Sequence, residues 1–316
     1  MSPHRSGRHC IDETAWQRTR LLGTTCSLIL MLWGAPQTLH AAEVRELVVG
    51  PVRLDAHTLG WNHHQPIHNM PVEFANDLWV TGADVHLIDG EGNPLPRQLL
   101  CHTTLYDSDI PYGGATMGLT MAPDPSSVRF PKGTGVPLFS GRSYHVLAVF
   151  KNTSEHAYPE VYLRLTLIGE PTGDEQPPRQ ALQLTALCIG GCDNEAMLYS
   201  APPGRSVRQE EAQFPVAGRI VLLTPHLHRY GKRLALEALD GTGRPRLIWQ
   251  VEPLEDAASP EFSLPSWTPD FAWRVTPNDR FRLTAEYENP TSYDWPAMAA
   301  LGAFFVPEAS PPGQAP

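Results

Sequence analysis

The residues best suited to chemistry lie in one short segment, 224–232, with the sequence Thr-Pro-His-Leu-His-Arg-Tyr-Gly-Lys. Its two histidines, His226 and His228, follow the apolar run 220–223 and precede a glycine turn. If that run is a β-strand, residues i and i+2 face the same side, about 6.6–6.8 Å apart at Cα. Two imidazoles on one face can bind one ion, and copper binds such nitrogens most tightly of the divalent first-row metals. The spacing therefore predicts a metal site.

A third soft donor stands downstream at Met298, directly before the apolar run 299–306. A methionine sulfur is a weak, polarisable ligand that suits copper, above all Cu(I). The alternative is that Met298 begins a strand and only packs against its neighbours.

The cysteines divide into a close pair and a single residue. Cys188 and Cys192 enclose Ile-Gly-Gly, a short loop that can bend to close a disulfide, while a redox or metal-binding pair is the alternative. Cys101 is then left over, and an unpaired thiol in an exported protein needs a reason.

Three further histidines, His63, His64 and His68, lie within residues 62–70, which also contain Met70. They predict either an extra copper site or ligands that this segment donates to a site elsewhere. The alternative is a polar loop whose histidines cap turns or face solvent.

The N-terminal residues 1–42 have the features of a secretory signal peptide. Arg18 and Arg20 precede the apolar stretch 21–33, and the small residues Ala41 and Ala42 end the segment. That stretch is too short for a comfortable membrane span, and no later run approaches spanning length. We therefore expect an exported protein, periplasmic or secreted, whose mature chain has no membrane span.

The charge of the chain excludes one class of partner. Residues 1–42 contain four arginines and two acidic residues, a net charge of +2, so their removal takes the formal charge from −10 to about −12. The mature chain has no basic patch of note, which argues against nucleic-acid binding.

The rest of the chain has the pattern of an all-β protein. It contains 32 prolines and 25 glycines, and long helical periodicity is absent. Short β-branched and aromatic runs between turn residues predict strands, which many such runs together assemble into sandwiches or barrels. The predicted strands are 44–54, 78–88, 98–105, 143–151, 160–168, 181–188, 219–224, 233–239, 247–251, 281–287 and 301–306.

A polar, proline-rich stretch divides the mature chain into halves of similar size. We predict a linker at 171–179 between an N-terminal β-sandwich, 43–170, and a C-terminal β-sandwich, 180–307. The low-complexity residues 308–316 predict a disordered tail.

Residues 225–232 resemble the His-x-His-x-x-Gly-Lys/Arg segment of the copper type II, ascorbate-dependent monooxygenases, the family of the peptidylglycine and dopamine hydroxylases. Leu99-Leu100-Cys101-His102 resembles the approach to that family's His-His pair, and 144–150 resembles the strand that carries its third first-domain histidine. Met298 stands where the family places its methionine ligand. The similarity covers most of 45–307, but only the His226/His228 segment is specific.

The resemblance implies a fold and a set of roles. It implies two tandem jelly-roll β-sandwich domains, with His226, His228 and Met298 holding the copper that binds dioxygen and faces the substrate C–H bond. A second copper, held in the family by three histidines, stores an electron from ascorbate. This chain has Cys101-His102 in place of His-His and Phe150 in place of the third histidine, so Cys101 and His102 are the candidate ligands of a second site.

Several functions follow from these residues. The first is an ascorbate-dependent monooxygenase that hydroxylates a C–H bond of a small molecule or peptide. The second is a non-catalytic protein that stores or delivers one copper ion, and the third is a metal-free binding module. The chain has no Gly-x-Ser-x-Gly, His-Glu-x-x-His or phosphate-binding loop. A cupin would place a glutamate about four residues beyond the histidines, where Lys232 and Arg233 stand.

Overall fold

The computed structural model of the chain describes residues 43–57, 67–108, 118–121, 126–171, 180–192, 198–255, 262–269 and 273–308. His40–Pro316 form one compact unit. The expected signal peptide, most of the expected linker and the last eight residues lie outside the described ranges, as do His63 and His64.

The described chain is all-β, as predicted. The N-terminal half contains β1 (Glu43–Leu54), β2 (Ile67–Glu73), β3 (Leu78–Ile88), β4 (Leu100–Asp107), β5 (Gly118–Met121), β6 (Ser127–Arg129), β7 (Thr134–Leu138), β8 (Ser143–Phe150) and β9 (Tyr158–Pro171). The described residues of this half also form one 3-10 turn, η1 (Arg97–Leu99). Among the described residues, no helix is long and apolar enough to span a membrane.

The C-terminal half continues in the same way. Its strands are β10 (Gln180–Ala181), β11 (Gln183–Cys188), β12 (Tyr199–Ala201), β13 (Gly204–Ala212), β14 (Gly218–Leu227), β15 (Gly231–Leu239), β16 (Pro245–Val251), β17 (Leu254–Glu255), β18 (Phe262–Ser263), β19 (Trp273–Val275), β20 (Arg280–Asn289), β21 (Trp295–Ala297) and β22 (Ala299–Pro307).

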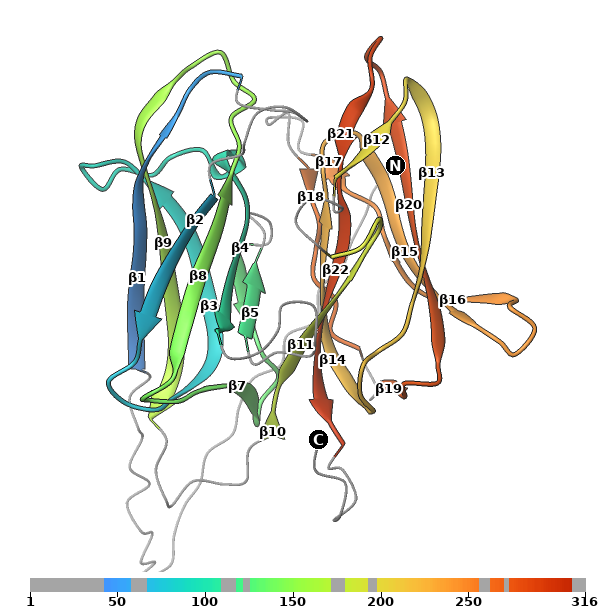
Figure 1. Ribbon diagram of the computed structural model, residues 1–316, viewed down its shortest axis with the longest axis horizontal. Coiled ribbons are helices and arrows are strands. Elements are labelled where there is room, and N and C mark those ends of the chain that lie inside the picture. The colour runs from blue at the N-terminus through green and yellow to red at the C-terminus, as the bar shows by residue number, and fades with distance from the viewer. Residues whose placement is uncertain are drawn as a thin grey trace, which may run out of the picture. The chain divides into compact units, whose positions relative to one another are not determined.

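The two halves repeat one arrangement of strands (Figure 1). The N-terminal half has the sheets β1-β9-β3-β7 and β2-β8-β4-β5, and the C-terminal half has β11-β22-β14-β19 and β13-β20-β15-β16. When the eight strands of each half are ranked along the chain, both halves have the orders 1-8-3-6 and 2-7-4-5. The tandem jelly-roll prediction requires such a repetition of one eight-stranded plan.

Alternation along β8 shows why these segments are strands. Tyr144, Val146 and Phe150 point into the core between the two N-terminal sheets, whereas Leu147 and Val149 lie in a separate cluster on the opposite face. Side chains in a strand alternate between faces, so a strand that is apolar at nearly every position must be covered on both sides. β8 is therefore a buried strand with two packed faces.

A buried asparagine lies at or just after the end of the equivalent strand of each half, Asn152 after β8 and Asn289 at the end of β20. The Nδ2 of Asn152 donates to the carbonyls of Asp55 (2.9 Å) and His156 (2.7 Å), and its Oδ1 accepts from Ser154. The Nδ2 of Asn289 does the same with Ala201 (2.9 Å) and Tyr293 (2.7 Å), and Thr291 donates to its Oδ1. Each asparagine ties its own turn to a distant strand or strand end through one carbonyl and closes the turn through a second. The second turn leads directly to Trp295, Pro296 and Met298.

Side chains from the C-terminal half complete the first core. Leu182, Leu184, Leu222 and Phe304 belong to the core cluster formed mainly by strands β1 to β9. The ring of Phe304 lies 5.0 Å from that of Phe130, centroid to centroid. The outward face of the sheet β11-β22-β14-β19 is therefore buried, and the residues that share it are not on a free surface.

Candidate metal centre

His226, on β14, and His228, the residue directly after β14, lie on that outward face. His226 pairs with Ala300 on β22, and the backbone N–H of His228 donates to the carbonyl of Met298 at 3.0 Å. Leu227, between the histidines, points the other way into the C-terminal core. The two rings have centroids 5.3 Å apart and planes at 85°. The predicted strand therefore places both imidazoles on one face, as the His-x-His spacing requires.

Met298 lies opposite His228 across the β14–β22 pair. It is 4% exposed and packs in one cluster with Cys101, Leu147, Val149 and Cys188. The Tyr287 hydroxyl accepts a hydrogen bond from the N–H of His228 at 3.1 Å and donates one to the carbonyl of Met298 at 2.5 Å. Tyr287 therefore fixes the backbone at both residues.

A β-bulge in β4 directs two neighbouring side chains to one side. Leu100 pairs with Phe150 and His102 pairs with Val149, so Cys101 is an extra residue opposite a single step of β8. A bulge of this kind breaks strict alternation and redirects a side chain. Cys101, fully buried, joins the cluster of Leu147 and Val149, on the face that His102 also occupies. Without the bulge, adjacent residues would point to opposite faces.

The residues predicted as two separate sites meet in one place. The Sγ of Cys101 lies 3.3 Å from Nε2 of His228 and 3.7 Å from Nε2 of His226. The rings of His102 and His226 have centroids 5.8 Å apart. The donor atoms of Cys101, His102 and His226 all lie within 4.8 Å of one another, and no other group of this kind occurs among the described residues. His228 is not a member of that group and reaches it through its Nε2, 3.3 Å from the Sγ of Cys101.

Hydrogen bonding sets the proton position on His228. Its Nδ1 lies 3.0 Å from the carbonyl of Pro296, which can only accept, so Nδ1 carries the hydrogen. The neutral ring then presents the Nε2 lone pair toward Cys101. Metal-binding histidines are commonly oriented in this way, by a carbonyl on the other ring nitrogen.

Burial keeps every member of the cluster neutral. Desolvation lowers the pKa of His228 to about 3 and that of His102 to about 4, and it lowers the pKa of His226 well below the ordinary value, with smaller contributions from nearby positive groups such as Lys151. Desolvation also raises the pKa of the Cys101 thiol to about 11. The Nε2 of His102 is buried without a hydrogen-bond partner. The cluster therefore combines a thiol and three neutral imidazoles, and the Nε2 of the His102 imidazole has no hydrogen-bond partner.

These pKa shifts predict that the metal-free protein loses stability as the pH falls. The unfolded histidines take up protons near pH 6.5, whereas the folded ones resist protonation, so full stability is present above about pH 6.5. Below it, each buried histidine removes about 1.4 kcal/mol per pH unit, until its folded pKa is reached. Urea unfolding of the chelator-treated protein at several pH values measures this slope. In His102→Leu the free energy of unfolding should fall less steeply with pH, by the contribution of one histidine, about 1.4 kcal/mol per pH unit. Equal slopes in wild type and His102→Leu would contradict the burial of His102 as a neutral imidazole.

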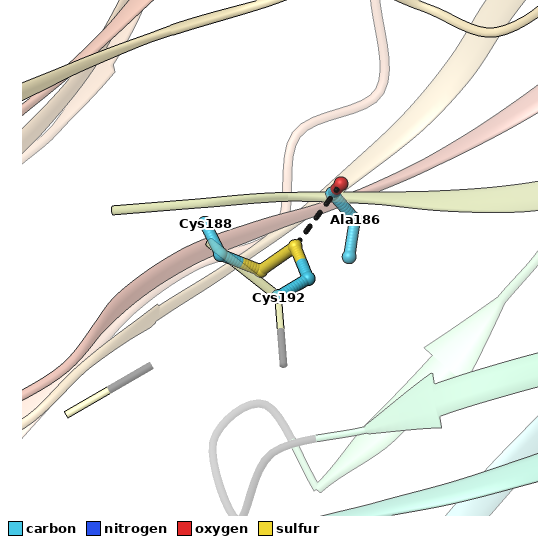
Figure 2. Close-up of a disulfide and its surroundings, with 3 residues drawn as sticks. All are labelled: Ala186, Cys188 and Cys192. Carbon is cyan, nitrogen blue, oxygen red and sulfur yellow. Dashed lines mark hydrogen bonds between the residues drawn. A yellow bond between two sulfur atoms is a disulfide. The ribbon is translucent and has the colours of Figure 1, made fainter. Parts of the chain in front are cut away.

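The predicted disulfide is present beside this cluster. Cys188 and Cys192 are bonded, and the loop between them contains Gly190 and Gly191 at φ values of 86° and 96°, which favour glycine. Cys188 pairs with Ala300, the residue that His226 contacts from the other side. Figure 2 shows the Sγ of Cys192 near the Ala186 carbonyl, 3.5 Å away; a disulfide sulfur has no hydrogen, so this is a contact only. Cys101 remains the free cysteine of the described residues.

His68 does not join the cluster. It lies on β2, and its ring packs edge-on against Phe150 with a centroid distance of 6.2 Å, on the core side of β8. Since His63 and His64 lie outside the described residues, the histidine-rich segment stays an untested prediction.

Two orienting groups, Tyr287 and the Pro296 carbonyl, were not predicted from the sequence. The sequence does contain a clue to them, because the segments around Asn152 and Asn289 in the two halves resemble each other. Asn152 is followed by Tyr158-Pro159, and Asn289 by Trp295-Pro296 at the same spacing. Phe150 stands two residues before Asn152, and Tyr287 stands two residues before Asn289. Aligning the two halves therefore shows that the second half has a tyrosine hydroxyl where the first has phenylalanine.

No protein-family model matches the chain, and no curated protein matches it. Among solved structures, the Macrobrachium rosenbergii nodavirus shares 10% identity over 90% of this chain and 96% of that chain, with a TM-score of 0.20. The PBSX exported protein XepA shares 10% identity over 82% of this chain and 86% of that chain, with a TM-score of 0.21. TM-scores this low carry no argument about the fold or the function of the chain.

Proposed function

We propose that this chain is an exported copper-binding protein with His226 and His228 as its principal ligands and Met298 as a weak neighbour. One observation carries the proposal: the Nε2 atoms of His228 and His226 lie 3.3 and 3.7 Å from the Sγ of Cys101, and the Pro296 carbonyl, by accepting from Nδ1 of His228, leaves the Nε2 lone pair of His228 facing that sulfur. Lone pairs that converge in a buried, uncharged place are costly unless a cation or proton satisfies them.

The donor types favour copper over harder ions. Imidazole, thiol and thioether groups are borderline or soft donors, whereas Mg²⁺ and Ca²⁺ prefer carboxylate and carbonyl oxygens. Within the described residues, the cluster contains no carboxylate. Zinc accepts the same nitrogens and thiolate, but copper stands above it in affinity for divalent ions and also tolerates the thioether as Cu(I).

Burial favours storage, delivery or electron exchange over oxygen chemistry. A catalytic metal needs an open position for its substrate, whereas Cys101 is fully buried, His102 and His228 are 8% and 4% exposed, and His226 is half-buried. The position at which the resemblance implies a third histidine holds Phe150, whose side chain fills the N-terminal core. We therefore place the non-catalytic copper protein ahead of the monooxygenase.

Copper counting on the mature protein tests this proposal. The chain beginning after Ala41 or Ala42 is reconstituted with Cu(I) or Cu(II), dialysed against a weak chelator and analysed for bound metal. We expect one tightly bound copper ion per chain and no ascorbate-driven oxygen uptake above that of a metal-free control. Two tight ions with sustained oxygen uptake would support the monooxygenase instead. Absence of tight copper, with zinc bound or with no metal bound, would overturn the proposal.

A further inference from the structure

We propose that Cys101 and His102 ligate the same ion as His226 and His228, so that one copper with a thiolate ligand joins the N-terminal and C-terminal sandwiches. This inference rests on the proposed copper function and specifies its coordination. The two pairs come from different halves of the chain: one from the bulge in β4, the other from the end of β14.

The two sulfur–nitrogen distances fit the coordination shell of one ion, and the His228 ring has to move closer to His102 and His226 when the ion binds. In four-coordinate sites a metal lies about 2.0–2.1 Å from nitrogen and about 2.3 Å from sulfur, so a tetrahedral angle separates sulfur from nitrogen by about 3.5 Å. The Sγ of Cys101 lies 3.3 and 3.7 Å from the two Nε2 atoms, on either side of that value.

The unpaired ring nitrogen of His102 is an independent reason to expect a single shared ion. Its Nε2 is buried and has no hydrogen-bond partner, and a buried nitrogen left in this way costs about 1–3 kcal/mol in general. The same nitrogen belongs to the group of donor atoms within 4.8 Å of one another. A bond from Nε2 to the ion would satisfy it, and the bulge that extends β4 by one residue is what brings it and Cys101 to the same side.

Coordination changes the state of the thiol. A metal-bound cysteine is deprotonated, so binding forms a Cu–S bond and releases one proton from Cys101 to solvent. A copper with a cysteine thiolate, two histidines and a distant thioether belongs to the class of sites that exchange single electrons. Because the ligands span both halves, the ion also stabilises the contact between the two sandwiches.

Absorption spectroscopy on the full mature chain tests the shared site. The probes are Cu(II) and, separately, Co(II), each added to wild-type protein, Cys101→Ser and His102→Leu. We expect wild type to bind one ion with an intense sulfur-to-metal charge-transfer band. Cys101→Ser should still bind one ion through its histidines, with roughly a hundredfold lower affinity and no such band. His102→Leu should keep the band and bind the ion more weakly.

The outcomes separate this inference from the copper proposal itself. One tightly bound copper in wild type without the band, or a band that persists in Cys101→Ser, would overturn the shared site and leave copper binding intact. No tight copper in wild type would remove both. Urea unfolding of each metal-free variant verifies that it is folded. With wild type and Cys101→Ser both saturated, the ion should raise the melting temperature more in wild type; an equal rise in the two proteins counts against the shared site.

Discussion

For the copper function proposed above, we expect replacement of His226 and His228 together by alanine to lower the affinity for copper by about four orders of magnitude. Four-ligand structural metal sites bind with about 10–16 kcal/mol, so each ligand contributes about 3 kcal/mol, and each 1.4 kcal/mol is a factor of ten. His228 is the more informative residue of the two, because Pro296 and Tyr287 already hold it in place. Competition with a chelator of known copper affinity measures the change in dissociation constant.

A matched control removes two histidines that lie outside the cluster. His86 is exposed on β3, and His145 on β8 interacts with the Asn69 side chain at 2.9 Å. We expect the double variant His86→Ala/His145→Ala to bind copper as wild type does. If it loses copper to the same extent as the His226/His228 variant, the binding is adventitious and the assigned ligands are wrong.

Replacing Phe304 by alanine lowers the free energy of unfolding by about 3–5 kcal/mol, the usual cost of emptying a buried aromatic position. Phe304 is fully buried on β22, and its ring packs against Phe130 from the other half of the chain. The cavity would therefore open between the two halves, where the backbone of two sheets limits relaxation. Equilibrium urea unfolding of the metal-free protein gives the change.

The control for Phe304 is an apolar side chain on the surface. Leu247 on β16 is 49% exposed, and such substitutions change stability by less than about 0.5 kcal/mol. We expect Leu247→Ala to unfold at nearly the wild-type urea concentration. A loss below about 1 kcal/mol in Phe304→Ala would mean that the two halves do not pack through this ring.

Much of the strand layout could be predicted from alternation and turn residues. β3, β8 and β20 were predicted nearly in full because apolar residues recur along them and glycine or polar turns bound them. β13 was missed, since its sequence Gly-Arg-Ser-Val-Arg-Gln-Glu-Glu-Ala is almost wholly exposed. It is nevertheless a strand, because nine consecutive residues pair with β20, and pairing at a sheet edge needs no apolar face.

The site was predictable residue by residue but not as one cluster. The His-x-His spacing placed His226 and His228 on one face, and the backbone carbonyl of Met298 accepts from the N–H of His228. That Cys101 lies against both imidazoles could not be predicted, for two reasons. A period-two pattern gives adjacent residues opposite faces, so the bulge at Cys101 reverses the expectation, and the contact of β4 with β14 depends on packing between halves that no local pattern encodes.

The short strand β10 has a consequence for the order in which the chain can fold. Gln180 and Ala181 pair in parallel with β7, the edge of the first sheet, and Leu182 is fully buried in the first core. An open sheet edge is a template for association with other chains. An N-terminal half that is synthesised before residues 180–182 therefore exposes the unpaired edge of β7. That edge can pair with other chains until β10 is synthesised and covers it.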